Sequence, residues 1–123
     1  QIEIANETLG IFDNPAFAPV FAPGSRAEVP LVGIVGGDVV SAQIDRLVVR
    51  DDEVMIVDYK TNRPPPRDVE DTPRAYRRQM SIYRAALAQM YPGKTVRCFI
   101  LWTNGPWMVE LPEHILTFGR LRA

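Results

Sequence analysis

The sequence predicts an α/β sandwich with a mixed central sheet, and three observations support this. Residues 27–60 contain β-branched runs separated by short breaks with glycine or aspartate, which are typical of hairpins. Residues 73–91 carry apolar positions at helical spacing, and residues 95–111 return to apolar, strand-like runs. Strands, a crossover helix and a further strand pair together favour helices packed against a sheet.

The first 24 residues mix apolar positions with repeated prolines. They predict a short helix near residues 3–11, followed by an irregular packed segment.

Three antiparallel strands are expected next, over residues 27–37, 38–50 and 53–60. The separators are GGD, at 36–38, and RDDE, at 50–53. Because such short polar separators close hairpins, neighbouring strands should pair with each other.

A loop and a helix follow the third strand. Residues 62–73 contain four prolines, which exclude a strand or a helix interior. The following segment, 73–91, predicts a helix between Pro73 and the Pro-Gly pair after Tyr91. Its apolar stripe consists of positions 76, 80, 83, 87 and 90.

The last part of the chain predicts a hairpin and a helix. TVRCFILWT, at 95–103, is a nearly continuous apolar run and indicates a strand buried on both faces. PWMVEL, at 106–111, follows an Asn-Gly turn and should be its partner. A terminal helix is expected over 112–120. Both Trp102 and Trp107 fit hairpin and core packing better than stacking on bases.

The length of 123 residues and the 46% of hydrophobic residues predict one domain with a real core. We divide it into a lead-in (1–24), a core (25–111) and a terminal helix (112–123). The chain begins at Gln1 without a methionine, so we expect a piece of a larger protein, truncated on its N-terminal side.

The overall composition excludes several kinds of site. The single cysteine, Cys98, rules out an internal disulfide and a cysteine-rich metal site, and its apolar surroundings indicate a buried thiol. The formal net charge of −1 favours no class of partner. No apolar run reaches the roughly 20 residues that span a bilayer, so we expect a cytoplasmic domain without a membrane partner.

The segment IVDYKTNR, at 56–63, places an acid and a base at the end of an apolar strand. Since side chains at i and i+2 share a face, Asp58 and Lys60 point the same way. A hairpin that turns at residues 51 and 52 also places Asp45 opposite Asp58, with Cβ atoms roughly 5 Å apart.

Two neighbouring carboxylates repel each other and require a cation. A hard divalent ion such as Mg²⁺ accepts carboxylate and carbonyl oxygens together with water. With Lys60 on the same face, this arrangement suits phosphodiester hydrolysis, because an ammonium stabilises charge on phosphate oxygens. An acid-x-Lys pair also occurs on solvated strand faces; the position of Asp45, flanked by apolar residues in QID, favours a site.

The order of these motifs resembles the RecB-type nucleases of the PD-(D/E)XK superfamily, which carry an Asp, then Asp/Glu-x-Lys, then Q-x-x-x-Y. The matching stretches here are IDRL, DYK and QMSIY. Over roughly residues 8–113 the chain is also similar to the nuclease domain of AddA-type helicase-nuclease subunits. The resemblance implies a restriction-endonuclease-like fold, with a mixed central sheet flanked by helices.

The resemblance also implies roles for individual residues. Asp45 and Asp58 would be metal ligands, the main-chain carbonyl of Tyr59 a third ligand and Lys60 the catalytic lysine. Glu28 resembles an upstream acid that lies near the metal or its waters.

A second group would support the site or touch DNA. Gln79 and Tyr83 share a helix face at i and i+4, although Tyr83 also falls on the apolar stripe. Thr61, Asn62 and Arg63 follow the lysine, and an arginine there suits phosphate. Several further arginines form either a phosphate-binding lip or a solvated helix face: Arg67, Arg74, Arg77, Arg78 and Arg84.

Two features depart from the family pattern. RecB-type nucleases usually place a histidine upstream of the first acid, but the only histidine here is His114, which we expect at the surface. The histidine-bearing helix would then precede Gln1. Also, Ala42 stands where many relatives have glycine.

The implied function is a Mg²⁺-dependent DNA exonuclease domain, with Mn²⁺ as a substitute ion, acting in a bacterial helicase-nuclease. It would cut unwound single strands while double-strand ends are processed for recombinational repair, beside an AddB-type partner subunit. ATP would act only in the parent protein's helicase region, since the phosphate-binding GxxxxGK[ST] motif is missing here. The alternatives are a non-catalytic DNA-binding or subunit-docking module of the same fold and a structural domain with fortuitous acids.

Overall fold

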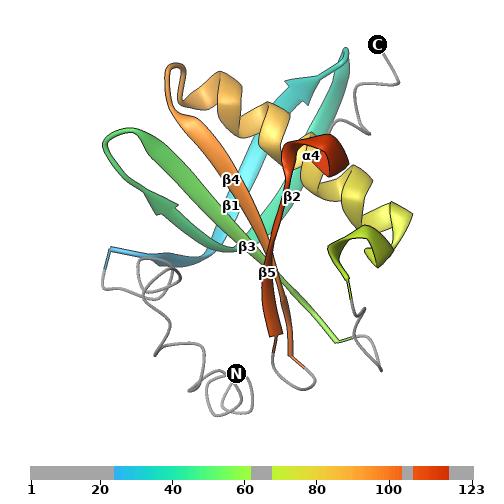
Figure 1. Ribbon diagram of the computed structural model, residues 1–123. Coiled ribbons are helices and arrows are strands. Elements are labelled where there is room, and N and C mark those ends of the chain that lie inside the picture. Colours follow the sequence, from blue (N-terminus) through green and yellow to red (C-terminus); the bar gives the residue numbers. More distant parts are fainter. Residues whose placement is uncertain (1–23, 62–67, 104–106, 117–123) are drawn as a thin grey trace.

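A five-stranded sheet carries one long helix on one face, as the computed structural model shows for residues 24–61, 68–103 and 107–116 (Figure 1). Because the sheet is mixed and helices pack against it, the predicted restriction-endonuclease-like α/β class is confirmed. The elements are β1 (Arg26–Val35), β2 (Asp38–Val49), β3 (Glu53–Lys60), the 3₁₀ helix η1 (Val69–Asp71), α4 (Arg74–Met90), β4 (Thr95–Trp102), β5 (Trp107–Leu111) and α5 (Glu113–Leu116).

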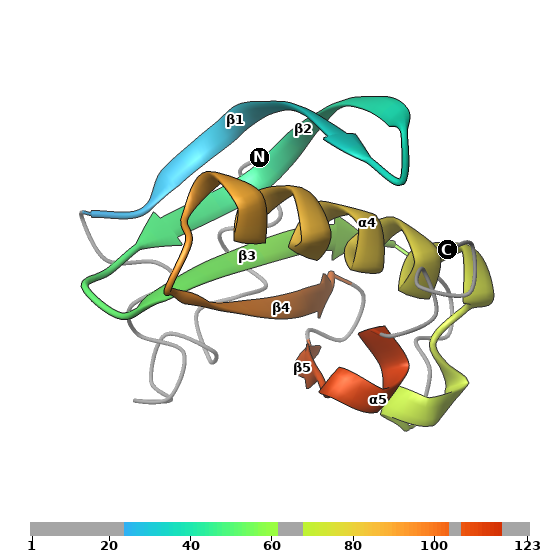
Figure 2. The same ribbon diagram turned by 90° about the horizontal axis from the view of Figure 1, so that it is seen from above.

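The strands lie side by side in chain order, β1-β2-β3-β4-β5. Neighbours are antiparallel except β3 and β4, which are parallel and connected through η1 and α4. A parallel pair needs such a crossover, so α4 crosses the sheet face, as Figure 2 shows. The β2–β3 register pairs Arg46 with Val57 and Val49 with Val54, which confirms the predicted turn at residues 51 and 52.

The predicted strand and helix limits agree with the structure to within about two residues where the chain is described. Gly36 and Gly37 close the first hairpin with φ of 59° and 88°, the left-handed values that a two-residue turn requires and glycine tolerates. The expected helix at 3–11 and the Asn-Gly turn lie outside the described residues, as does the end of the terminal helix beyond Leu116.

One prediction was wrong within the proline-rich loop. Residues 69–71 form the short helix η1 rather than loop, because Asp68 caps it by accepting a hydrogen bond from the Glu70 main-chain N. Residues 62–67 lie outside the described part of the chain.

Helix α4 presents the predicted apolar stripe to the sheet. Met80 and Leu87 are fully buried, and Tyr76 and Tyr83 pack partly buried against the same cluster. Met90, at the C-terminal end of the stripe, is 50% exposed. The stripe therefore holds α4 on the sheet over its first four turns and ends one turn before the helix does.

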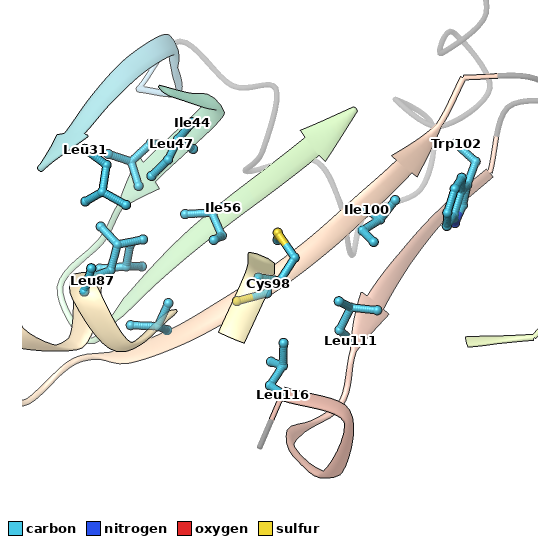
Figure 3. Packing of buried hydrophobic residues seen from close by; sticks show 14 residues of the cluster. Leu31, Ile44, Leu47, Ile56, Leu87, Cys98, Ile100, Trp102, Leu111 and Leu116 are labelled. Atoms are coloured by element: carbon cyan, nitrogen blue, oxygen red, sulfur yellow. The ribbon is translucent and has the colours of Figure 1, made fainter. Parts of the chain in front are cut away.

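Two apolar clusters lie on the two faces of the sheet. The larger one fills the space between the strands and α4 and includes Ile56, Ile100 and Leu87 (Figure 3). The second, on the other face, includes Val57 and Phe99. β3 and β4 are thus buried on both faces, as the continuous apolar run of β4 predicts.

Cys98 and the tryptophans have the expected structural roles. Cys98 is fully buried, and burial raises the pKa of its thiol to about 12, so the thiol is inert at neutral pH. Trp102 is also fully buried, and Trp107 packs against the same cluster. In the described residues no helix has both the length and the apolar character to cross a membrane.

We predict that Leu87→Ala destabilises the fold by about 2–5 kcal/mol, because it leaves a cavity between α4 and the sheet. The measurement is urea unfolding followed by circular dichroism. Met90→Ala, in the same helix at a half-exposed position, is the matched control and should change stability by less than about 1 kcal/mol. Equal effects of the two substitutions would contradict the packing described.

Candidate active site

The carboxyl end of β3 holds a buried ion pair. Asp58 and Lys60 point to the face of the sheet that α4 covers, as the strand alternation predicts. Asp58 Oδ2 lies 2.7 Å from Lys60 Nζ, and the side chains are 10% and 16% exposed. This oxygen is buried, and within the described residues it accepts no hydrogen bond of normal geometry.

Burial raises the pKa of Asp58 to about 6. Desolvation is the largest cause, the nearby ammonium of Lys60 opposes it, and the neighbouring Asp45 carboxyl adds to it. The single lysine therefore does not compensate for the burial of this acid beside another one.

Asp45 comes to Asp58 through a break in the regular pairing of β2. The β2–β3 pairing stops at Arg46 and Val57, and Asp45 Oδ2 instead accepts a hydrogen bond of 2.7 Å from the Tyr59 main-chain N. Ile44 and Leu47, three residues apart, pack in the same cluster, so the alternation of faces is interrupted between them. The predicted proximity of the two acids is confirmed, although through a side-chain contact rather than regular pairing.

Glu28 is not gathered with these acids. In the β1–β2 register it would face Asp45, but the pairing skips both positions, and Glu28 is exposed with a φ of 55°. Within the described ranges, no three His, Cys, Asp or Glu side chains gather to hold a metal ion. The expected role of Glu28 near a metal therefore stays a prediction without geometric support.

Lys60 is held by three neighbours. Besides its ion pair with Asp58, Nζ donates a hydrogen bond of 2.9 Å to Gln79 Oε1 and lies 4.2 Å from the centre of the Tyr76 ring. Gln79 Nε2 in turn donates to the Tyr83 hydroxyl at 3.0 Å. The predicted Gln-x-x-x-Tyr pair of α4 thus supports the lysine.

Tyr83 itself has both of the roles that the sequence left open. It packs against the core cluster, and its hydroxyl accepts the bond from Gln79. Burial raises the pKa of this hydroxyl, so Tyr83 stays neutral at physiological pH.

Tyr76 is a site residue that the sequence reasoning assigned only to the apolar stripe. Its ring lies between Lys60 and Trp102, with ring centres of Tyr76 and Trp102 6.0 Å apart. The sequence spacing could have indicated this contact with Lys60, because Tyr76 lies one helical turn before Gln79, on the helix face that meets the lysine.

In the described part of the chain, the arginines and the residue that follows Lys60 do not gather into one basic surface. Thr61 is exposed, and Asn62, Arg63 and Arg67 lie outside the described residues. Arg77 donates to the main-chain carbonyls of Thr72 and Glu70, and Arg84 lies 3.8 Å from Glu113. These two arginines stabilise the local structure, whereas Arg78 lines an open groove beside Gln79.

His114 is an exposed surface residue, as expected. Its Nε2 lies 2.7 Å from Glu70 Oε2, far along the chain from the acids of β2 and β3. The structure gives it no place among the site residues described above.

The two aspartates fit a hard divalent cation in their chemistry. Asp58 presents a buried carboxylate whose Oδ2 is paired with Lys60, and Asp45 is anchored through one oxygen, so the two acids lie side by side with hard oxygen donors. The third ligand from the Tyr59 carbonyl stays a prediction. Two acids for a cation and a lysine on the same face form an arrangement that can bind and polarise a phosphate group.

Comparison with known proteins agrees with this geometry. The profile described as the PD-(D/E)XK nuclease superfamily matches residues 11–111. A search of curated proteins gave no significant match.

Among solved structures, the chain is similar to one described as the crystal structure of SSO0001. The TM-score is 0.51 at 12% identity, and the match covers 98% of this chain and 55% of that one, so this chain spans about half of that protein. At this identity the likeness supports the fold alone. The family profile, in contrast, covers most of the sequence, and the chain therefore belongs to the PD-(D/E)XK nuclease superfamily.

Proposed function

We propose that this chain is a Mg²⁺-dependent DNA nuclease domain that hydrolyses phosphodiester bonds in single strands. The observation that carries the proposal is the position of Asp58, Lys60 and Asp45 together at the end of β3. The alternative of a non-catalytic DNA-binding or docking module has less support, since such a module would not need two neighbouring acids and a lysine at one buried place.

Each of these residues has a distinct role in the proposed reaction. Asp45 and Asp58 would hold the divalent ion, which supplies activation of water and neutralisation of phosphate charge when bound. Lys60 donates hydrogen bonds to an oxygen of the phosphate and stabilises its growing negative charge. Gln79 and Tyr76 keep the ammonium in place for that contact.

The cellular role belongs to the same proposal. The motifs EVPLVG, QIDRLVV, IVDYKTNRP and LWTNGPWMVELP favour the nuclease domain of an AddA-type subunit. In that setting the domain acts as an exonuclease on strands that a helicase region delivers, beside an AddB-type partner in a bacterial cytoplasm. Its role is then the processing of double-strand ends for recombinational repair.

We predict that the chain cuts end-labelled single-stranded DNA in Mg²⁺ or Mn²⁺ and not in EDTA. Asp58→Asn and Asp45→Asn should each lower the rate by at least about 100-fold, because each removes a carboxylate from the ion. Lys60→Ala should lower it on the order of 100-fold, because the phosphate loses its cationic donor. The measurement is a gel assay of cleavage rates.

Asp51→Asn is the matched control for that assay, since Asp51 is an exposed acid in the turn between β2 and β3. It should cut at the native rate. Equal rates in Asp51→Asn and Asp58→Asn would exclude the site. A native chain that binds DNA without cutting in any metal would favour the docking module.

The raised pKa of Asp58 predicts a pH-dependent stability. The folded protein binds this proton up to a pH of about 6, whereas the unfolded chain releases it near 3.8, so the stabilisation present at low pH is lost as pH rises between these values. We therefore compare the free energy of unfolding of Asp58→Asn with that of the native chain, both in EDTA. The advantage of Asp58→Asn should grow by about 1–3 kcal/mol from about pH 4.5 to about pH 7.5. Urea unfolding at the two pH values measures this difference.

The same two proteins test the metal without any turnover. Mg²⁺ should stabilise the native chain at neutral pH, by about 2.7 kcal/mol at a hundredfold excess over its Kd, and should stabilise Asp58→Asn much less. Identical stabilisation of the two proteins by Mg²⁺ would show that the ion binds elsewhere. In the pH experiment, a stability difference between them that does not change with pH would contradict the burial of an ionised Asp58.

Tyr76 should act as a positioning residue for Lys60. Tyr76→Phe keeps a ring over the ammonium and should retain near-native kcat, whereas Tyr76→Leu should lower kcat by about fivefold with little change in KM. A merely structural role would lower thermal stability in proportion to the loss of activity. Steady-state kinetics beside melting curves separate the two roles.

A further inference from the structure

An open groove runs beside the site, between the first half of β2 and the first half of α4. Its volume is about 450 Å³. The strand wall consists of residues 39–42, and the helix wall consists of Ala75, Arg78, Gln79, Ile82 and Tyr83. Figure 2 shows the two elements side by side along this part of the molecule.

Gln79 and Tyr83 belong to both the groove and the site. Gln79 accepts the hydrogen bond from Lys60 and donates to Tyr83, and both side chains line the groove. The groove therefore adjoins the site through the side chains of Gln79 and Tyr83.

The groove combines apolar walls with one cation. Val40, Ala42 and Ile82 provide apolar surface, and Tyr83 adds an aromatic ring. No acid lines the groove in the part of the chain that the structure describes. Arg78, half-buried, has no ion pair or hydrogen bond with any described residue, in contrast to Arg77 and Arg84.

These properties point to a ligand with a flat apolar part and a negative charge. A half-buried guanidinium with no counter-charge among the described residues favours an anion, and arginine suits the geometry of phosphate. A volume of about 450 Å³ lies at the small end of ligand sites, which suits a single nucleotide rather than a base pair.

We infer that this groove binds one unpaired nucleotide of the strand being cut, next to the phosphate at Lys60. The base lies on the apolar walls and Tyr83, and its flanking phosphate contacts Arg78. The inference rests on the proposed nuclease function and extends it, because it assigns the preference for single strands to a place in this chain.

Substitutions at two positions of α4 test the groove and leave Lys60, Gln79 and Tyr83 unchanged in sequence. Ala75→Glu places a negative charge in the groove, and it suits the fold because Ala75 is exposed in the first helical turn, where acids are favourable. Ala88→Glu is the matched control, with the same change at an exposed position of the same helix outside the groove. Arg78→Ala removes the cation, and Arg78→Lys should restore part of its effect.

The measurement is the fluorescence anisotropy of a labelled oligothymidylate of ten nucleotides in EDTA, with an unlabelled DNA duplex as competitor. Arg78→Ala and Ala75→Glu should each weaken binding by about tenfold, and Arg78→Ala should lower the salt slope by about 0.7, the share of one phosphate contact. Ala88→Glu should bind as the native chain does. The duplex should compete poorly.

The outcomes separate this inference from the nuclease proposal. If the native chain cuts DNA while Ala75→Glu and Arg78→Ala bind and cut normally, the groove inference is overturned and the nuclease stands. If the native chain binds the oligonucleotide through the groove but cuts nothing, the groove stands and the nuclease fails. If the folded native chain does not bind the oligonucleotide, or prefers the duplex, the groove inference is overturned.

Discussion

The hydrogen bond from the Tyr59 main-chain N to the Asp45 carboxylate determines the geometry of the whole site. The regular β2–β3 pairing ends one residue before it, and the carboxylate replaces a main-chain acceptor at that position. This contact holds Asp45 beside Asp58. At the same place the alternation of faces along β2 is interrupted, and on the neighbouring strand β1 the backbone of Glu28 is left-handed. Irregular backbone therefore gathers where the acids meet, as is common at functional sites.

Asp58 lies in an environment that a structural role alone explains poorly. Its strand is buried on both faces, and its side chain is 10% exposed, next to a second acid and Lys60. Because two carboxylates outnumber one ammonium among the described residues at this place, Asp58 either takes up a proton near neutral pH or recruits a cation. The apolar residues around it, among them Ile100 and Trp102, keep water away from the pair and fix the strand that carries it.

Much of this could be predicted from the sequence, for identifiable physical reasons. A short polar turn fixes hairpin register, so the approach of Asp45 to Asp58 followed from the turn at residues 51 and 52. The φ of Glu28 could not be predicted, because it arises where the β1–β2 pairing is interrupted, which the residue type does not reveal. Tyr76 was assigned to the core because an apolar stripe does not distinguish a ring that packs on aliphatic groups from one that caps an ammonium.

Helix α4 links the chemistry of Lys60 to the groove. The parallel pairing of β3 and β4 requires a crossover, and this places the first turns of α4 above the carboxyl end of β3, where Lys60 lies. The same turns carry Tyr76 and Gln79 toward the lysine and Arg78 into the groove. All three side chains therefore belong to one helix, so the groove and the contacts of Lys60 share a single structural element. The crossover that the parallel β3–β4 pairing requires is what brings them together.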